Sequence, residues 1–247
     1  KKKYSYNNIS ILVRAIFQTR EFEERFLKIG MGYRVIGGTK FYERAEIKDS
    51  VAFLRIVNQK NDDLAFERII NTPKRSIGDS TVKQLHDYGR LNKKSLEDSS
   101  IDLLRLNKIK PKTKLGLIQI LNLFKKWRFD AKEKKHYELM EIILDESGYS
   151  KMLKDKKDLE SEGRLENLKE LIRGMNDFDN LQGFLEHVAL ATSIDQDWDG
   201  QKVNLMTMHA AKGLEFDAVF LPGWEEGLFP HQKSLEEKGD LALEEER

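Results

Sequence analysis

The stretch that decides the fold is Val203–His231, which reads VNLMTMHAAKGLEFDAVFLPGWEEGLFPH. It opens on an apolar run typical of a buried strand, and a second apolar run follows at Ala218–Leu221. Between the two runs, four polar residues fall within nine positions: Thr207, His209, Lys212 and Glu215. Because ligands of open α/β sheets bind beyond the carboxyl ends of the strands, this pattern favours a binding site.

Each of these polar residues also has a plainer interpretation when it is taken singly. His209 is then a hydrogen-bonded core histidine, and Lys212 and Glu215 are charges on the surface. Their concentration between two buried strands is what favours a site over those alternatives. Short polar side chains such as that of Thr207 can bond a phosphate or a sugar.

The start of the chain also has the sequence pattern of an α/β fold. The run ISILV (Ile9–Val13) predicts a buried strand, and Tyr33–Gly38 predicts a short strand and turn. A helix capped by Thr19 and ended by Gly30 is predicted between them. The order strand, helix, strand is that of an α/β layer.

The long middle of the chain is predicted to be helical. Apolar residues recur there at spacings of three and four. The spacing predicts helices over about 43–58, 62–70, 79–89, 96–106, 113–129, 134–147, 161–174 and 179–193. Asp79 or Ser80 is expected to cap the third of these helices and Gly89 to end it, with Gly148 and Gly174 as further C-terminal caps.

The fold class predicted from this organisation is mainly α with an α/β part. Both ends of the chain have an α/β pattern and the segment between them is helical. The simplest account is therefore a helical domain inserted into a loop of an α/β domain. Such insertions are tolerated where the chain ends of the inserted domain lie close together.

Composition excludes several classes of protein. The 247 residues are 39% hydrophobic and 34% charged, and they contain no cysteine, which rules out disulfides and cysteine–zinc sites. No metal-ligating set is predicted. No apolar run of about 18 residues predicts a membrane span, and the opening KKKYSYNN lacks the apolar core of a secretory signal. We therefore expect a cytoplasmic protein without contact to a membrane.

Charge is distributed unevenly along the chain, although the formal net charge is only +1. Residues 101–135 carry a net charge of +8, and residues 201–247 carry −5. The basic segment is either a solvated lysine-rich helix face or a surface for a polyanion. Composition alone favours the solvated face.

The loop NTPKRSIGDST (Asn71–Thr81) joins two predicted helices. Lys74 and Arg75 precede Ile77 and Gly78, so that a buried anchor and a permissive backbone point follow a basic pair. The free N–H groups that open the next helix suit an anion. The loop is either an ordinary turn between helices or an element that holds a DNA phosphate backbone without reading bases.

Several of these segments, in order, resemble one family. The string LMTMHAAKGLEFDAVFLPGWEEGLFPH resembles motif V of the UvrD/PcrA/Rep group of superfamily 1 DNA helicases. GGTKFYERAEIKD (Gly37–Asp49), NDDLAFERIINTPKRSIGDST (Asn61–Thr81) and GRLENLKEL (Gly163–Leu171) resemble parts of the family's helical 2B domain, and LEEER (Leu243–Arg247) the start of motif VI. The resemblance covers essentially the whole chain.

The resemblance implies a motor with two RecA-like domains, each carrying a helical insert. Such enzymes hydrolyse ATP with Mg²⁺, move 3′ to 5′ on single-stranded DNA and unwind duplex DNA in repair and replication. The resemblance places a partial RecA-like (P-loop NTPase-like) 2A domain at 1–35 and 201–247, and an all-helical 2B DNA-binding insert at 36–200. The remaining domains, 1A and 1B, would be partners, and repair proteins are possible further partners.

The resemblance also assigns residues by position. Glu215 matches a glutamate that contacts the sugar of ATP, and Arg14, Thr207 and His209 match residues that contact single-stranded DNA. Duplex-binding positions correspond to Lys48 and to the loop residues Lys74, Arg75, Ser76, Ile77, Gly78, Asp79, Ser80 and Thr81. Two matches depart from the family. The segment Val13–Ile16 reads VRAI in place of YRTN, and Ser76 stands where the family has glycine.

The sequence holds no G-x-x-x-x-G-K-[ST] loop to cradle phosphates and Mg²⁺. The complete catalytic set is therefore expected elsewhere, no ATP or Mg²⁺ is expected to bind the chain by itself, and the chain alone should lack ATPase activity. Two alternatives stay open: a non-enzymatic module that binds DNA duplexes or junctions, and the helicase part of a helicase–nuclease.

Overall fold

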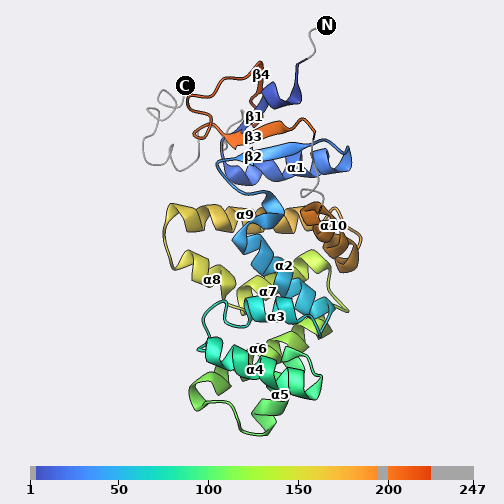
Figure 1. Cartoon of the computed structure of the whole chain (residues 1–247), viewed down its shortest axis with the longest axis vertical. Helices are drawn as coiled ribbons and strands as arrows, with labels where there is room; N and C mark the ends of the chain where they lie inside the picture. Colours follow the sequence, from blue (N-terminus) through green and yellow to red (C-terminus); the bar gives the residue numbers. More distant parts are fainter. Residues whose placement is uncertain (1–3, 194–199, 224–247) are drawn as a thin grey trace. The chain divides into compact units, whose positions relative to one another are not determined.

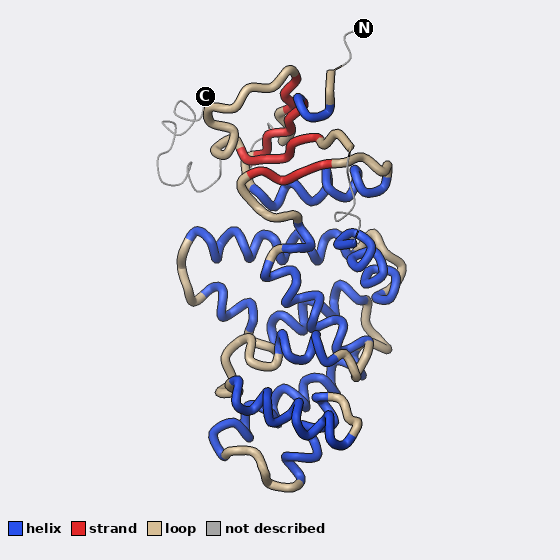
Figure 2. The backbone as a smooth tube through the Cα atoms, in the orientation of Figure 1, coloured by secondary structure: helices blue, strands red, loops and turns tan. Residues whose placement is uncertain are grey.

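The structure is a computed structural model that describes residues 4–193 and 200–223, and the chain divides into two compact units (Figure 1). Residues 1–44 and 193–247 belong to the first unit and residues 45–192 to the second. The strands that the structure describes all lie in the first unit, and the described part of the second is helical (Figure 2). The chain is thus mainly helical with a small α/β part. Residues 224–231 and 243–247, which carry the end of the motif V resemblance and LEEER, lie outside the described residues.

A parallel four-stranded sheet organises the first unit. Its strands are β1 (Ile9–Val13), β2 (Tyr33–Ile36), β3 (Val203–Thr207) and β4 (Ala218–Phe220), in the order β2-β3-β1-β4. The predicted strands are present, and β1 and β3 pair on both sides, as apolar runs of this length suggest. The prediction that the run at 218–221 is buried is wrong, because β4 is an edge strand in which Val219 and Phe220 are 47% and 58% exposed. All four strands run the same way, so their carboxyl ends meet at one edge of the sheet.

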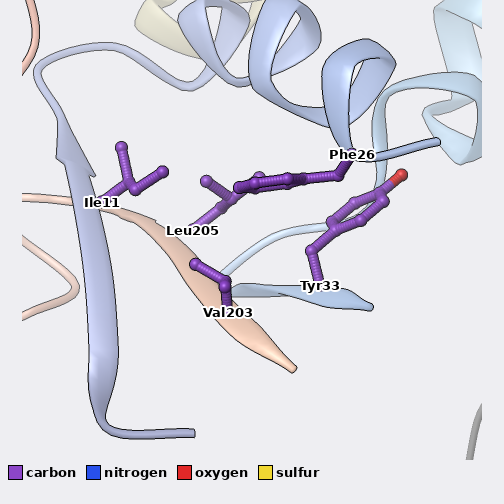
Figure 3. Packing of buried hydrophobic residues seen from close by; sticks show 5 residues of the cluster. All are labelled: Ile11, Phe26, Tyr33, Val203 and Leu205. Atoms are coloured by element: carbon purple, nitrogen blue, oxygen red, sulfur yellow. The ribbon is translucent and has the colours of Figure 1, made fainter. Parts of the chain in front are cut away.

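The helix α1 (Thr19–Lys28) packs on this sheet through an apolar cluster (Figure 3). The rings of Phe26 and Tyr33 lie 5.8 Å apart, and Ile11, Val203 and Leu205 complete the cluster. Short 3₁₀ turns flank β1, at Tyr6–Asn8 before it and Ile16–Gln18 after it. Apolar burial of this kind is the main favourable contribution to folding.

Residues after β2 stay with the first unit through a buried polar network on α1. The 3₁₀ turn Phe41–Glu43 is held because the N–H of Phe41 donates to Glu23 at 3.0 Å, and the Tyr42 hydroxyl donates to Glu24 at 2.5 Å. The Arg44 guanidinium donates to Thr19 Oγ1 at 2.8 Å. The units therefore divide at residues 44/45 and 192/193, whereas the resemblance placed the divisions at 35/36 and 200/201.

This network is charged although it lies in the core. The side chains of Glu23 and Arg44 are almost fully buried and lie 3.6 Å apart. Burial raises the pKa of Glu23, while the hydrogen bonds that it accepts and the charge of Arg44 act in the opposite direction. Burial, followed by the charge of Glu24, also raises the pKa of Tyr42. Buried charges of this kind stay in place because each has a partner.

The second unit is built from helices. They are α2 (Ala45–Asn58), α3 (Asp63–Ile69), α4 (Asp79–Asn92), α5 (Leu96–Arg105), α6 (Pro111–Asp130), α7 (His136–Glu146), α8 (Tyr149–Lys154), α9 (Leu159–Met175) and α10 (Leu181–Ser193). Their core is aromatic, since Phe53 packs edge-on against Trp127 at 5.8 Å and against Tyr149 at 6.2 Å. The polar atoms of two rings are paired, because Trp127 Nε1 donates to Glu146 and the Tyr149 hydroxyl to Asp49.

Four predictions about helix ends are wrong. Gly89 lies inside α4, where a Cβ would come within 2.7 Å of the Lys94 carbonyl, and Gly174 lies inside α9. Gly78, and not Asp79 or Ser80, is the N-cap of α4. Thr19 does not cap α1 but lies in its first turn. The structure also adds α8, which the sequence did not predict.

Candidate nucleic-acid and nucleotide interface

The carboxyl edge of the sheet brings together segments that are far apart in the sequence. Val13 at the end of β1 lies opposite Thr207 at the end of β3. One step further, the N–H of Met208 donates to the Val13 carbonyl at 3.0 Å. Arg14 follows directly on Val13 and is half-buried. The structure therefore places Arg14 beside the first residues that follow β3.

A tight turn follows β3 and is organised by Thr207. The Thr207 side chain is half-buried, and its Oγ1 accepts from the N–H of Ala210 at 3.3 Å. The hydroxyl hydrogen stays available for an acceptor outside the turn. His209 is exposed, which excludes the interpretation of this residue as a core histidine.

Gly37, which directly follows β2, packs against the same turn. Gly37 has a φ of +76°, which favours glycine, and a Cβ placed on it would lie 3.0 Å from Ala210 Cβ. Strands β1, β2 and β3 thus all contribute backbone around one turn. The resemblance gave no role to Gly37, and the only sequence signal for it was the pair of glycines after β2.

Glu215 lies further along the connection from β3 to β4. Residues 212–215 are all exposed, and Gly213 has a φ of +82°. The connection is tied down beyond them, because the N–H of Asp217 donates to Asn8 O at 2.9 Å and Asn8 Nδ2 donates to Asp217 Oδ2 at 2.9 Å. Among the described residues no contact joins Glu215 to Thr207 or His209. Its exposed carboxylate accepts no hydrogen bond from the residues that the structure describes.

The loop of the second unit is organised from within by Asn71. Its side-chain oxygen accepts from the N–H of Arg75 at 2.7 Å and from that of Ile77 at 3.2 Å. Ile77 is 1% exposed and anchors the loop in the core. The peptide Thr72–Pro73 is cis. Asn71 was not singled out from the sequence, although an asparagine that opens such a loop is a frequent acceptor for backbone N–H groups.

Arg75 points inward, whereas the other charge of the basic pair stays on the surface. Its guanidinium donates to the carbonyls of Ile69 at 3.2 Å, Pro73 at 3.0 Å and Ser147 at 3.0 Å. Burial lowers the pKa of Arg75 to about 10. These contacts give Arg75 a role in holding the loop, and they leave Lys74 as the exposed cation of the pair.

The remaining predicted duplex-binding residues differ in exposure. Ser76, Gly78, Asp79 and Ser80 are exposed, whereas Thr81 is 6% exposed, so that its side chain is turned into the protein. Lys48 is exposed in the first turn of α2, and within the described part of the chain no contact joins it to the loop. The structure thus leaves Lys48 and four of the predicted loop residues exposed to solvent.

Helix α6 supports the loop through two residues that sequence reasoning missed. The Thr113 hydroxyl donates to the Ser76 carbonyl at 2.9 Å. A Cβ on Gly116 would lie 2.3 Å from the Arg75 carbonyl, so that the loop backbone rests directly on the helix. The signal in the sequence was a glycine in the interior of an apolar helical pattern, which often marks a close backbone approach.

The described residues contain neither a metal-binding cluster nor a membrane-spanning helix. No group of three or more His, Asp or Glu residues is arranged to hold a metal ion within residues 4–193 and 200–223. In the same part of the chain, none of the helices combines the length and the apolarity that a bilayer crossing requires.

Comparison with known proteins gives the family. The model of the UvrD-like helicase C-terminal domain matches residues 1–247. A probable DNA helicase II homolog of Rickettsia conorii is 44% identical over 248 residues, which are 99% of this chain and 38% of the relative. The DNA helicase II of Rickettsia typhi is 43% identical over 249 residues, 100% of this chain and 38% of the relative. The ATP-dependent DNA helicase PcrA of Staphylococcus aureus is 38% identical over 253 residues, 98% of this chain and 34% of the relative.

The chain therefore spans less than two-fifths of the length of these relatives. The family match, in contrast, extends from its first residue to its last. With the parallel sheet and the helical unit described above, the conclusion is that this chain belongs to the UvrD-like helicase C-terminal domain family.

Proposed function

We propose that this chain is part of an ATP-dependent 3′-to-5′ DNA helicase that moves on single-stranded DNA and unwinds duplex DNA. In this proposal the first unit is the partial RecA-like 2A domain and the second is the 2B insert. The names of the relatives support the helicase activity, and the match over the whole chain supports the domain assignment.

The observation that carries the proposal is the composition of the carboxyl edge of the sheet. Arg14 directly follows β1, Thr207 ends the neighbouring strand β3, His209 follows in the exposed turn, and Glu215 lies on the same connection. A cation and a hydroxyl suit a phosphate backbone, and an exposed carboxylate suits sugar hydroxyls. A DNA contact and a nucleotide contact on one short connection would couple movement along DNA to the nucleotide state.

ATP with Mg²⁺ supplies the phosphoryl transfer that drives such a motor. The residues of this chain fit a limited role toward it. Glu215 is exposed and its carboxylate is open to a donor, so it would accept hydrogen bonds from the nucleotide sugar. The groups that hold the phosphates and the metal would come from the complementary 1A and 1B domains.

Contact with the duplex is proposed for the exposed loop residues of the second unit. Lys74 supplies a charge, and Ser76 and Ser80 supply hydroxyls near the N-terminus of α4. Such contacts would hold the backbone without reading sequence. A second function, as a duplex-binding module without enzymatic activity, is favoured by one observation: the loop is anchored within the helical unit by Asn71 and Ile77.

Two variants of the complete polypeptide that carries this chain test the proposal. Glu215→Gln should raise the KM for ATP without changing affinity for single-stranded DNA. His209→Ala should raise the DNA concentration that half-maximally stimulates ATP hydrolysis by about tenfold, because a hydrogen bond to a charged group contributes about 1.5 kcal/mol. Steady-state ATP hydrolysis titrated with each ligand separates the two effects.

The matched control is Glu21→Gln, which removes an exposed carboxylate of α1 that lies outside the connection from β3 to β4. Both kinetic constants should stay at their wild-type values in that variant. A Glu215→Gln variant that behaves like the Glu21→Gln control would contradict the assignment of the nucleotide contact.

A further inference from the structure

The lysines and arginines of the basic segment, residues 101–135, have different surroundings in the structure. Between residues 103 and 129 the chain has eight Lys or Arg residues and no Asp or Glu. Lys126 pairs with Glu146, and Arg128 bonds Glu97 at 2.6 Å. Those two charges are therefore neutralised within the helical unit, and they leave no net charge for a partner.

Three other members of the segment form what we call the α6 lysine cluster: Lys108, Lys110 and Lys112. All three are exposed, and the structure gives none of them an ion pair among the residues that it describes. The carbonyl of Lys108 accepts from Gln84 Nε2 at 3.1 Å, which fixes the backbone of the cluster against α4. The cluster is therefore held in place by its backbone while its ammonium groups face solvent.

The α6 lysine cluster adjoins the loop assigned above to duplex DNA. Thr113, the residue after Lys112, donates from its hydroxyl to the Ser76 carbonyl at 2.9 Å. One turn further along α6, Gly116 lies against the Arg75 carbonyl. The start of α6, which carries the lysines, is therefore held directly against the loop.

The placement of these charges is unfavourable for the helix that carries them. Lys110 is the N-cap of α6, Lys112 lies in its first turn, and this turn contains no acidic residue. Cations at a helix N-terminus oppose the helix dipole. Lys132, in contrast, follows the C-terminus of α6, where a cation is favourable, and Lys134 lies between the end of α6 and Lys135, the N-cap of α7. Helix stability therefore explains Lys132 and does not explain Lys110 or Lys112.

We propose that the α6 lysine cluster extends the duplex-binding surface of the loop, and that it contacts phosphates of the DNA backbone beyond those that the loop contacts. The inference rests on the proposed function of the loop. The ammonium groups act as point charges on flexible stems, so the contacts are independent of base sequence. Each contact releases counterions from the DNA, which makes its contribution dependent on salt.

The test measures binding of residues 1–247 to a fluorescent DNA duplex of arbitrary sequence over a range of salt concentrations. The variant carries Lys110→Gln and Lys112→Gln, and its matched control carries Lys132→Gln and Lys134→Gln, which removes the same charge elsewhere. Because each phosphate contact contributes about 0.9 to the slope of log affinity against log salt, the first variant should lower this slope by about 2. The control should keep the wild-type slope.

Thermal unfolding separates loss of binding from loss of fold. The double variant at Lys110 and Lys112 should melt at or above the wild-type temperature, since it removes two unfavourable charges from the start of α6. Equal slopes for the two double variants would overturn the inference, because the effect would then follow net charge and not position.

A third variant distinguishes failure of this inference from failure of the proposed function. The Lys110/Lys112 variant could keep the wild-type slope of log affinity against log salt while Lys74→Gln weakens binding. That result would overturn the inference and leave the assignment of the loop to duplex DNA standing. A wild-type chain without salt-dependent duplex binding would overturn both. A slope lowered only by the Lys110/Lys112 variant would support the cluster.

Discussion

Ser76 shows what a single side chain changes at the proposed duplex contact. It stands where the resembling family has glycine, and its φ is +60°, in the left-handed region. A Cβ in that region costs roughly 1–2 kcal/mol. The loop nevertheless forms, because Asn71, Ile77 and Arg75 hold its backbone from within. The departure from glycine therefore changes stability without removing the turn.

Ser76→Gly should raise the free energy of unfolding by about 0.5–1 kcal/mol, because relief of the left-handed Cβ exceeds the added freedom of glycine in the unfolded chain. The same replacement at Ser80, in the first turn of α4, should lower it by about 0.5 kcal/mol through reduced helix propensity. Urea denaturation of both variants measures the difference. Effects of equal sign at the two serines would contradict the backbone argument.

Some residue roles were predictable from the sequence, and Arg75 shows why others were not. The exposed positions of Lys74 and His209 agree with what local pattern suggests for polar residues beside a turn. The inward direction of Arg75 depends on the Ser147 carbonyl, 72 positions away in the sequence. No local pattern contains that partner, so the basic pair looked like two equivalent charges.

At the scale of elements, helix α6 packs directly against the loop Asn71–Thr81 and supports it. The loop backbone rests on the position of α6 that lacks a side chain, and Thr113 bonds it one turn earlier. The surface proposed for DNA therefore has a rigid support, and the support can be altered without changing any exposed residue.

Gly116→Ala should destabilise the chain by about 1–3 kcal/mol, because the new Cβ would lie 2.3 Å from the Arg75 carbonyl and one of the two must move. Gly163→Ala is the matched control. Gly163 also lies within a helix, α9, but its Cβ would meet nothing within 4 Å. The control should therefore gain up to about 1 kcal/mol.

Chemical denaturation of both alanine variants measures whether each replacement lowers or raises the free energy of unfolding. Duplex affinity should fall with the Gly116 variant and stay unchanged with the control. A stabilised Gly116 variant would mean that α6 and the loop are not in contact in solution.

Element boundaries mark the limit of what sequence pattern predicted. Periodicity located the long helices, because a buried face repeats over several turns. It missed α8, since Tyr149–Lys154 completes less than two turns. Gly89 and Gly174 were taken as terminators, yet both lie inside helices. A glycine that ends a helix and one that permits close packing look alike until the neighbouring element is known.

At the scale of the whole molecule, the chain combines a small sheet with a separate helical unit. The parallel order β2-β3-β1-β4 shows that β1 pairs with strands from the other end of the chain. The sequence predicted this organisation, because its pattern changes from α/β to all-helical and back to α/β along the chain. The place where the first segment ends was less predictable, because it depends on the buried bonds of Glu23 to residues after β2.

Residues 1–247 alone should not hydrolyse ATP, with or without single-stranded DNA, because the sequence contains no glycine-rich phosphate loop. The complete polypeptide should hydrolyse ATP and separate a duplex that carries a 3′ single-stranded tail. A coupled assay for released phosphate, run on both proteins, measures the first expectation. Turnover by residues 1–247 comparable to that of the complete polypeptide would refute the proposed division of the catalytic groups.

The pairing of β1 with β3 has a consequence for biosynthesis. Val13 leaves the ribosome about 190 residues before its partner Thr207, which at typical translation rates follows roughly 10–40 s later. The apolar strand Ile9–Val13 must wait for that time without its central neighbour. The helical unit, whose contacts lie within residues 45–192, can fold during the delay and shorten the loop that the sheet must close. The strand pairing therefore predicts that the helical unit folds first during synthesis and the sheet last.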